Sequence, residues 1–344
     1  MTEVSVKTTS SLDTKKWSDF VYNHPYGNIF QTPEMAEVYK RTRNYEPILL
    51  AVVDDTDEII ALLQAVVIKE KGGIFEAFSS RSIIQGGPLL PLFIENEGIK
   101  VLKILIEYYD EIAQKKALYT QIRNMWDTSE ISGILSSMGY EYKEHLNFLI
   151  DLNRPEEEIW KNIHKSRRKG INRAAKKGVF IEELRDKSLI PIFYDIIKET
   201  YKNANIPLAD ISLFESAFEL LVPKHMAKFY MAKYKDIYIG ARAVLCYRGL
   251  IYDWYAGALS DYLSLYVNEA LVWYILKEGA NSEYHTFDFG GAGSPYKEYG
   301  VREFKRRFGG KMVNYGRYTK IYSPLKMKIA RVGFGLYRRV GISK

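Results

Sequence analysis

The 344-residue chain has 47% apolar and 26% charged residues and no run of 18 apolar residues, which excludes a largely disordered chain and a membrane-spanning helix. Its single cysteine (Cys246) and five scattered histidines exclude an internal disulfide and a cysteine-rich metal site. The net charge of +7 is concentrated in residues 161–178 and 300–344, so the rest of the chain is acidic and we expect an anionic partner. The first ten residues are polar, unlike a signal peptide, so a cytoplasmic protein without a metal ion is expected.

The first half of the chain alternates predicted strands and helices. A turn of sequence Asp-Asp-Thr-Asp joins two β-rich runs, 47–55 and 58–70, which predicts a hairpin. Apolar side chains from Ile99 to Tyr109 recur at helical spacing, which predicts a helix over 97–117. The other predicted elements of this half are strands 74–79, 118–125 and 140–152, a loop at 85–91 and a short helix from Ser129.

Residues 151–155 are a predicted domain junction. Pro155 and three glutamates begin a helix, because proline and acidic side chains suit a first helical turn, and Gly178 ends it. Strand 179–184, helices 188–204 and 211–221, a meander of strands 226–234, 237–247 and 250–258, helix 263–278 and strand 284–289 follow. The two halves have elements in a similar order, and their antiparallel meanders favour an α+β fold over a doubly wound parallel sheet.

The stretch HTFDFGGAG, residues 285–293, resembles two motifs that it does not complete. Asp288 would hold magnesium in a protein kinase, but the kinase Gly-rich loop, strand lysine and His-Arg-Asp loop are missing. The glycines follow a late strand, which does not fit a dinucleotide fingerprint. We expect a backbone turn beside a ligand, with Asp288 accepting local N–H bonds, and the alternative is a plain tight turn.

Five ordered blocks cover most of the chain and together resemble the Fem family of peptidoglycan interpeptide-bridge transferases, within the wider Gcn5-related acyltransferases. The blocks are HPYGNIFQTPEMAEVYK (24–40), IWKNIHKSRRKGINRAAKKGV (159–179), YDWYAGALSDYLSLYVNEALVWYILKEGA (252–280), TFDFGGAG (286–293) and YGVREFKRRFGGKMVNYGRY (299–318). The resemblance implies two tandem acetyltransferase-like domains, residues 1–150 with 318–344 and residues 151–317, where the chain end returns to the first domain. Between Trp160 and Pro191 there is no room for the coiled-coil arm of some members.

The resemblance also implies transfer of an aminoacyl group from aminoacyl-tRNA to an amine of a nucleotide- or lipid-linked cell-wall precursor, without a cofactor. Phe304 and Lys305 match the family's Phe-Lys pair, in which the lysine stands near the reacting ester and its charge can stabilise an oxyanion. Lys40 and Tyr255 match precursor-binding positions, and Arg302 is a further substrate-binding candidate. The alternatives are a cation in a basic run for Lys305, a surface lysine for Lys40 and a core aromatic for Tyr255.

The basic helix is the predicted tRNA contact. Its residues Lys165, Arg167, Arg168 and Lys169 would meet tRNA phosphates in a salt-dependent way, and the alternative is a solvated helix face. The chain departs from the family where Gly86 replaces an arginine and where no arginine follows Thr200, so the acceptor is left open.

Two other functions remain open, an acyl-CoA-dependent N-acyltransferase of cell-surface glycan synthesis and an inactive glycan-precursor binder. The pyrophosphate loop of ordinary acetyltransferases is not found, which argues against acyl-CoA. We expect a monomer. Apolar residues spaced from Leu325 to Val340 predict a C-terminal helix that docks on the first domain, with a secondary peripheral contact with an anionic membrane.

Overall fold

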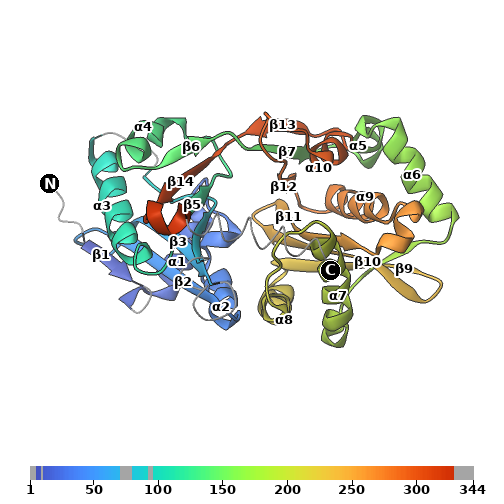
Figure 1. The fold of residues 1–344 in the computed structure, drawn as a ribbon, viewed down its shortest axis with the longest axis horizontal. Coiled ribbons are helices and arrows are strands. Elements are labelled where there is room, and N and C mark those ends of the chain that lie inside the picture. Colours follow the sequence, from blue (N-terminus) through green and yellow to red (C-terminus); the bar gives the residue numbers. More distant parts are fainter. Residues whose placement is uncertain (1–4, 9–10, 70–79, 92–95, 329–344) are drawn as a thin grey trace. The chain divides into compact units, whose positions relative to one another are not determined.

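The computed structural model describes residues 5–8, 11–69, 80–91 and 96–328 (Figure 1). The chain forms two compact units, Met1–Glu144 with Tyr315–Lys344 (unit 1) and His145–Asn314 (unit 2). Each unit is built on one seven-stranded sheet of mostly antiparallel strands, so the predicted α+β class is confirmed. Within the described ranges no helix is long and apolar enough to span a bilayer.

Unit 1 has the sheet order β1-β2-β3-β4-β5-β14-β6, in which only β4 and β5 run parallel. Its elements are β1 Ser5–Thr8, α1 Thr14–Asn23, a 3₁₀ turn Ile29–Gln31, α2 Pro33–Arg41, β2 Tyr45–Val53, β3 Ile59–Ile68, β4 Arg81–Gln85, α3 Asn96–Ala113, β5 Tyr119–Arg123, α4 Ser129–Ser137, β6 Glu141–Lys143 and β14 Arg317–Ile321. Thr32 caps α2 by accepting from the Met35 amide, and Pro33 follows it at the first helical position.

Unit 2 has the sheet order β13-β7-β12-β11-β10-β9-β8, in which only β11 and β12 run parallel. Its elements are β7 Leu146–Asp151, α5 Glu156–Asn162, α6 Lys165–Lys176, β8 Phe180–Glu183, α7 Ile190–Asn203, α8 Ile211–Leu221, β9 Ala227–Tyr234, β10 Ile237–Tyr247, β11 Leu250–Ala258, α9 Val267–Ala280, β12 Thr286–Gly291, α10 Gly300–Arg306 and β13 Lys311–Asn314. Short 3₁₀ turns are Lys187–Leu189, Val222–Lys224 and Ser260–Leu265.

The two units repeat the same order of elements. A strand, two helices and three antiparallel strands are followed by a helix, a strand parallel to the last one, a short helix and an edge strand, first from β1 to β6 and again from β8 to β13. Each sheet also takes in one strand from outside that run: β14 lies between β5 and β6, and β7 lies between β12 and β13. The similarity predicted from element order is therefore a repeated fold.

Both faces of the unit 1 sheet are covered, which explains why β2 is almost wholly apolar. Successive side chains of a strand point to opposite faces, and Leu50 packs in the core with Leu102 and Leu105 of α3. Leu49, one residue earlier, is also buried, and α2 packs on the same strand. The core of unit 2 lies between its sheet and α9, and it includes Phe287, Phe289 and Leu271, among others.

A buried carboxylate of α3 bonds to residues at and just after the end of β14. Asp110 of α3 accepts hydrogen bonds from the hydroxyls of Tyr140 (2.7 Å) and Tyr322 (2.6 Å) and from Lys320 Nζ (2.7 Å). The Tyr322 hydroxyl also lies 2.9 Å from Thr120 Oγ1 on β5. Two residues at the end of β14 are thus bonded to α3.

Three predicted elements divide differently in the structure. The predicted strand 140–152 is two strands, β6 and β7, which belong to different sheets, so contacts divide the chain at Glu144/His145 and not at 150/151. The predicted helix 155–178 breaks into α5 and α6, because Ile163 is buried with an extended backbone and the His164 amide bonds to the Arg307 carbonyl. The predicted helix 263–278 begins as a 3₁₀ turn.

Two other predictions fall largely outside the described residues. The predicted strand 74–79 lies outside them, and β4 follows at Arg81. The C-terminal helix is described only over 324–328, where the backbone is helical, and the rest of its apolar stripe lies beyond.

Candidate active site

The sheet of unit 2 opens where its two parallel strands separate. β11 and β12 pair over three residues, from Leu250↔Thr286 to Tyr252↔Asp288, and β12 then changes register against β7. Gly290, with φ of +67°, occupies the irregular stretch. In unit 1 the matching strands β4 and β5 stay paired over five residues. The opening beyond Asp288 therefore belongs to unit 2 alone.

Lys305 of α10 reaches the backbone of β12 at this opening. Its Nζ donates to the carbonyl oxygens of Phe289 (2.5 Å) and Gly291 (2.9 Å). Burial lowers the pKa of Lys305 to about 8, although the nearby carboxylates of Asp253 and Asp288 favour its charged form. A half-buried lysine thus lies at the point where the strands part.

Two buried carboxylates lie near Lys305. Asp288 Oδ1 accepts from Asn147 Nδ2 (2.6 Å) and from the Gly290 amide (2.7 Å), as expected for a turn-forming aspartate. Asp253 Oδ2 accepts from Arg242 Nη1 (2.9 Å), and its other oxygen has no hydrogen-bond partner among the described residues. Burial raises the pKa of both aspartates, while Lys305 opposes the shift.

Asp253 and Asp288 do not belong to a larger cluster of possible metal ligands among the described residues. Within the part of the chain that the structure describes, no three His, Cys, Asp or Glu side chains are grouped so that they could hold a metal ion. Asp288 instead bonds to a backbone amide and a neighbouring amide side chain.

Arg302, a predicted substrate contact, is bonded to the glycine loop. Its Nε donates to the Ala292 carbonyl (3.0 Å), and its Nη2 donates to the carbonyls of Ser294 and Lys297, the latter at 2.8 Å. With Lys305, the short helix α10 therefore holds the loop after β12 through backbone carbonyls. The substrate-binding role of Arg302 stays a prediction.

Phe304 is covered by an arginine of the basic helix. The guanidinium carbon of Arg167 lies 4.4 Å from the centre of the Phe304 ring, and Arg167 Nη1 lies 2.5 Å from Glu269 Oε1 of α9. Arg167 had been grouped with the predicted tRNA contacts, but its side chain turns into the protein and is only 19% exposed.

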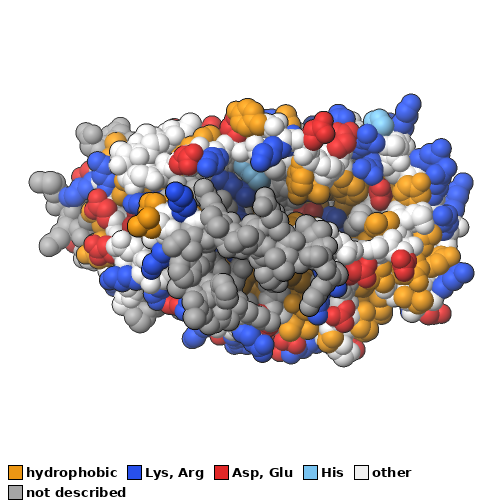
Figure 2. Space-filling model, viewed as in Figure 1, with side chains coloured by type: hydrophobic (Ala, Val, Ile, Leu, Met, Phe, Trp, Pro, Cys, Tyr) orange, Lys and Arg blue, Asp and Glu red, His pale blue; other side chains and the backbone are white. Residues whose placement is uncertain are grey.

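The remaining cations of α6 lie on its outer face, where Figure 2 shows Lys and Arg side chains gathered. They line a shallow hollow of about 440 Å³, formed by Lys165, Arg168, Lys169, Asn172, Arg173 and Lys176. Like charges four residues apart, such as Lys165 and Lys169, repel each other on a helix. Arg173 donates to the Tyr266 hydroxyl (3.0 Å). This face is suited to a polyanion.

Tyr255 and Lys40 are the other two predicted precursor contacts. Tyr255 of β11 packs among aromatic rings, with its ring centre 4.8 Å from that of Phe214 on α8 and 5.7 Å from that of Tyr201 on α7. Lys40 is 75% exposed in the last turn of α2, in unit 1, with its Nζ 3.9 Å from a Glu37 oxygen. Precursor binding by either residue stays a prediction.

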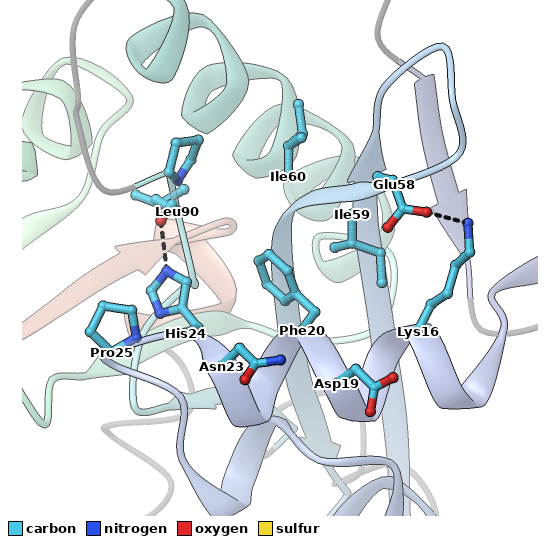
Figure 3. Close-up of a pocket in the computed structure, with 11 residues that line it drawn as sticks. Lys16, Asp19, Phe20, Asn23, His24, Pro25, Glu58, Ile59, Ile60 and Leu90 are labelled. Atoms are coloured by element: carbon cyan, nitrogen blue, oxygen red, sulfur yellow. Dashed lines mark hydrogen bonds and ion pairs between the residues drawn. The ribbon is translucent and has the colours of Figure 1, made fainter.

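A further hollow of about 450 Å³ lies in unit 1 beside α1 and β3 (Figure 3). Phe20 and Leu90 give it an apolar lining. Several of its polar groups are bonded: Lys16 Nζ lies 2.7 Å from Glu58 Oε1, and His24 Nε2 lies 2.7 Å from the Leu90 carbonyl. None of the predicted site residues lines it.

Sequence reasoning missed Asp253 and Arg242, the buried ion pair beside Lys305. A signal was present, because each is a charged residue within a strand of mostly apolar neighbours, and such residues are buried only when they are paired. Asn147, which bonds to Asp288, had no comparable signal.

Comparison with known proteins agrees with this architecture. Residues 161–298 match the family model described as an acetyltransferase (GNAT) domain. No curated protein matches the sequence. A crystal structure of FemX covers 95% of this chain and 100% of its own, with a TM-score of 0.70 and 16% identity.

Two further solved structures have the same fold at low identity. A tandem GNAT protein from the clavulanic acid biosynthesis pathway covers 94% of this chain and 99% of its own, with a TM-score of 0.60 and 10% identity. L-PGS from Bacillus licheniformis covers 93% and 96%, with a TM-score of 0.55 and 16% identity. The chain therefore has a fold of two tandem GNAT-like domains, and residues 161–298, most of which lie in unit 2, match the model of an acetyltransferase domain.

Proposed function

We propose that the chain transfers an aminoacyl group from aminoacyl-tRNA to an amine of a cell-wall precursor, in peptidoglycan synthesis. The observation that carries the proposal is Lys305, half-buried where β11 and β12 separate and next to two buried carboxylates. The basic outer face of α6 supports a polyanionic donor. The resemblance of the sequence to the Fem family and the likeness of the fold to FemX point in the same direction.

The reaction would be the aminolysis of an ester. The amine nitrogen attacks the ester carbonyl carbon, a C–N bond forms, the C–O bond to the tRNA ribose breaks, and the proton that the amine loses balances the one that the ribose oxygen gains. Two N–H groups of Lys305 bond to carbonyls of β12, and the third has no acceptor among the described residues. In its charged form it can donate to the developing oxyanion or to the leaving oxygen.

A second candidate is acyl transfer from acyl-CoA to an amine of a sugar or peptide. The match of residues 161–298 to an acetyltransferase domain favours it. An acyl-CoA donor offers only the few phosphates of CoA, whereas tRNA is a long polyanion. The exposed cations that extend along α6 therefore favour tRNA as the donor.

One transfer assay separates these functions. Labelled pools of aminoacyl-tRNA and of acyl-CoA are each offered with a nucleotide-linked muramyl peptide and with a lipid-linked precursor. We expect label transfer from aminoacyl-tRNA, reduced by roughly a hundredfold or more in Lys305→Met. Lys311→Met, an exposed lysine of β13, is the matched control. Transfer from acyl-CoA alone would favour the second candidate, and precursor binding without any transfer would indicate a non-catalytic protein.

A further inference from the structure

Arg167 differs from the other cations of α6. Lys165 and Lys169 are exposed, whereas the side chain of Arg167 is 19% exposed and that of its partner Glu269 is 11% exposed. The two side chains are 2.5 Å apart. A polyanion on the outer face of α6 would therefore have to displace Glu269 before it could bind Arg167, and breaking a buried pair is strongly unfavourable.

The stack on Phe304 leaves one arginine N–H without a partner. The flat guanidinium lies over the Phe304 ring at 4.4 Å, and its buried Nε has no hydrogen-bond acceptor among the described residues. An unsatisfied buried donor costs free energy, so the arrangement is not the most stable one available to an arginine. The arrangement does, however, place the planar guanidinium against the ring of Phe304, the residue next to Lys305.

A second contact joins α6 to the same turn of α10. The His164 amide, just before α6, donates to the Arg307 carbonyl at 2.8 Å. Phe304 and Arg307 are thus both held by α6, and Lys305 lies between them. α10 is only seven residues long, and a helix of that length depends on such tertiary contacts for its position.

We propose that Arg167 is a positioning residue, which holds the Phe304–Lys305 turn against α6 and α9 and so links the basic face of α6 to the site of Lys305. This rests on the proposed function for the role of Lys305 in the reaction. The inner face of α6 then places the lysine, and its outer face binds the polyanion. A shift of α6 on polyanion binding would be carried to Lys305 through Arg167.

The first test measures the position of Lys305 directly. Acylation of lysines by acetic anhydride is followed against pH by peptide mass spectrometry, in the parent, in Arg167→Gln and in Arg173→Gln. Arg173 is the matched control, because it also lies on α6 and its guanidinium lies over a ring, that of Tyr266, just before α9, at 5.9 Å. We expect the Lys305 midpoint near 8 in the parent and in the control, and higher by roughly one unit or more in Arg167→Gln as burial is lost.

The second test separates positioning from polyanion contact. The binding of total tRNA is measured against salt concentration for Arg167→Gln and for the double variant Arg168→Gln/Lys169→Gln. We expect the parent salt slope for Arg167→Gln and a slope smaller by roughly one to two for the double variant. A smaller slope in Arg167→Gln together with a parent-like Lys305 midpoint would overturn the proposal.

Neither outcome depends on catalysis. The acylation assay needs no substrate, so a protein that transfers nothing would refute the proposed function and leave the test of Arg167 intact. If Arg167→Gln does not fold, Phe304→Leu removes the stack while Arg167 and Glu269 keep their ion pair, and its Lys305 midpoint should also rise. An unchanged midpoint in a folded Phe304→Leu protein would equally count against the proposal.

Discussion

Removing the hydroxyl of Tyr322 should weaken the attachment of β14 to α3. The Tyr322 hydroxyl donates to the carboxylate of Asp110 at 2.6 Å and lies 2.9 Å from Thr120 Oγ1. Burial raises the pKa of Tyr322, so the phenol stays protonated and remains a donor. In Tyr322→Phe, Asp110 keeps Tyr140 and Lys320 as donors, and the loss is about one hydrogen bond to a charged group.

Such a bond contributes about 1.5–3 kcal/mol, so the free energy of unfolding should fall by roughly 2 kcal/mol. For a domain of 150–250 residues this lowers the melting temperature by roughly 4–8 °C, measured by calorimetry. Tyr108→Phe is the matched control, because Tyr108 lies two residues before Asp110 on α3 and is 52% exposed. If Tyr322→Phe and Tyr108→Phe both have the melting temperature of the parent, the hydrogen bonds of Asp110 do not hold β14 in place.

Three further outcomes are expected. If the charged form of Lys305 is required, kcat should fall as pH rises through about 8, by roughly tenfold per unit beyond it, and a rate that still climbs at pH 9 would contradict this. Gly290→Ala should cost about 1–2 kcal/mol in urea unfolding, because φ is +67° and the new Cβ would lie 3.3 Å from Tyr252 Oη. Purified protein should neither bind nor hydrolyse magnesium-ATP, and a magnesium-dependent ATPase activity abolished by Asp288→Asn would refute that expectation.

The class of the fold could be predicted from local patterns, whereas its connections could not. The apolar spacing of Leu102, Leu105 and Tyr109 predicts α3, and all three are fully buried. By contrast, residues 140–152 form one β-rich run, and nothing within it indicates that the chain leaves one sheet after Lys143 and enters another at Leu146. The sheet that a strand joins is decided by distant partners, here β14 for β6 and β12 with β13 for β7.

A count of charges does not show which way the side chain of Arg167 faces. Counting charges placed it with Lys165, Arg168 and Lys169 on one predicted tRNA face. Helical spacing separates it from them: Gly170, Ile171 and Ala174 are the buried residues of α6, and Arg167 precedes them at spacings of three, four and seven on the same stripe. The phase of the helix was in the sequence, but the partners of an inward arginine, Phe304 and Glu269, were not.

The buried carboxylates of the two units differ in how completely they are hydrogen-bonded. In unit 1, β4 and β5 remain paired over five residues, and the buried carboxylate of Asp110 accepts three hydrogen bonds. In unit 2, the matching strands separate after three pairs, and Asp253 keeps one buried oxygen without a partner near Lys305. A satisfied network stabilises a fold, whereas a buried group left unsatisfied needs a reason outside stability. The unpartnered oxygen of Asp253 beside Lys305 therefore supports the proposed role of this lysine, whereas the Asp110 cluster is explained by stability alone.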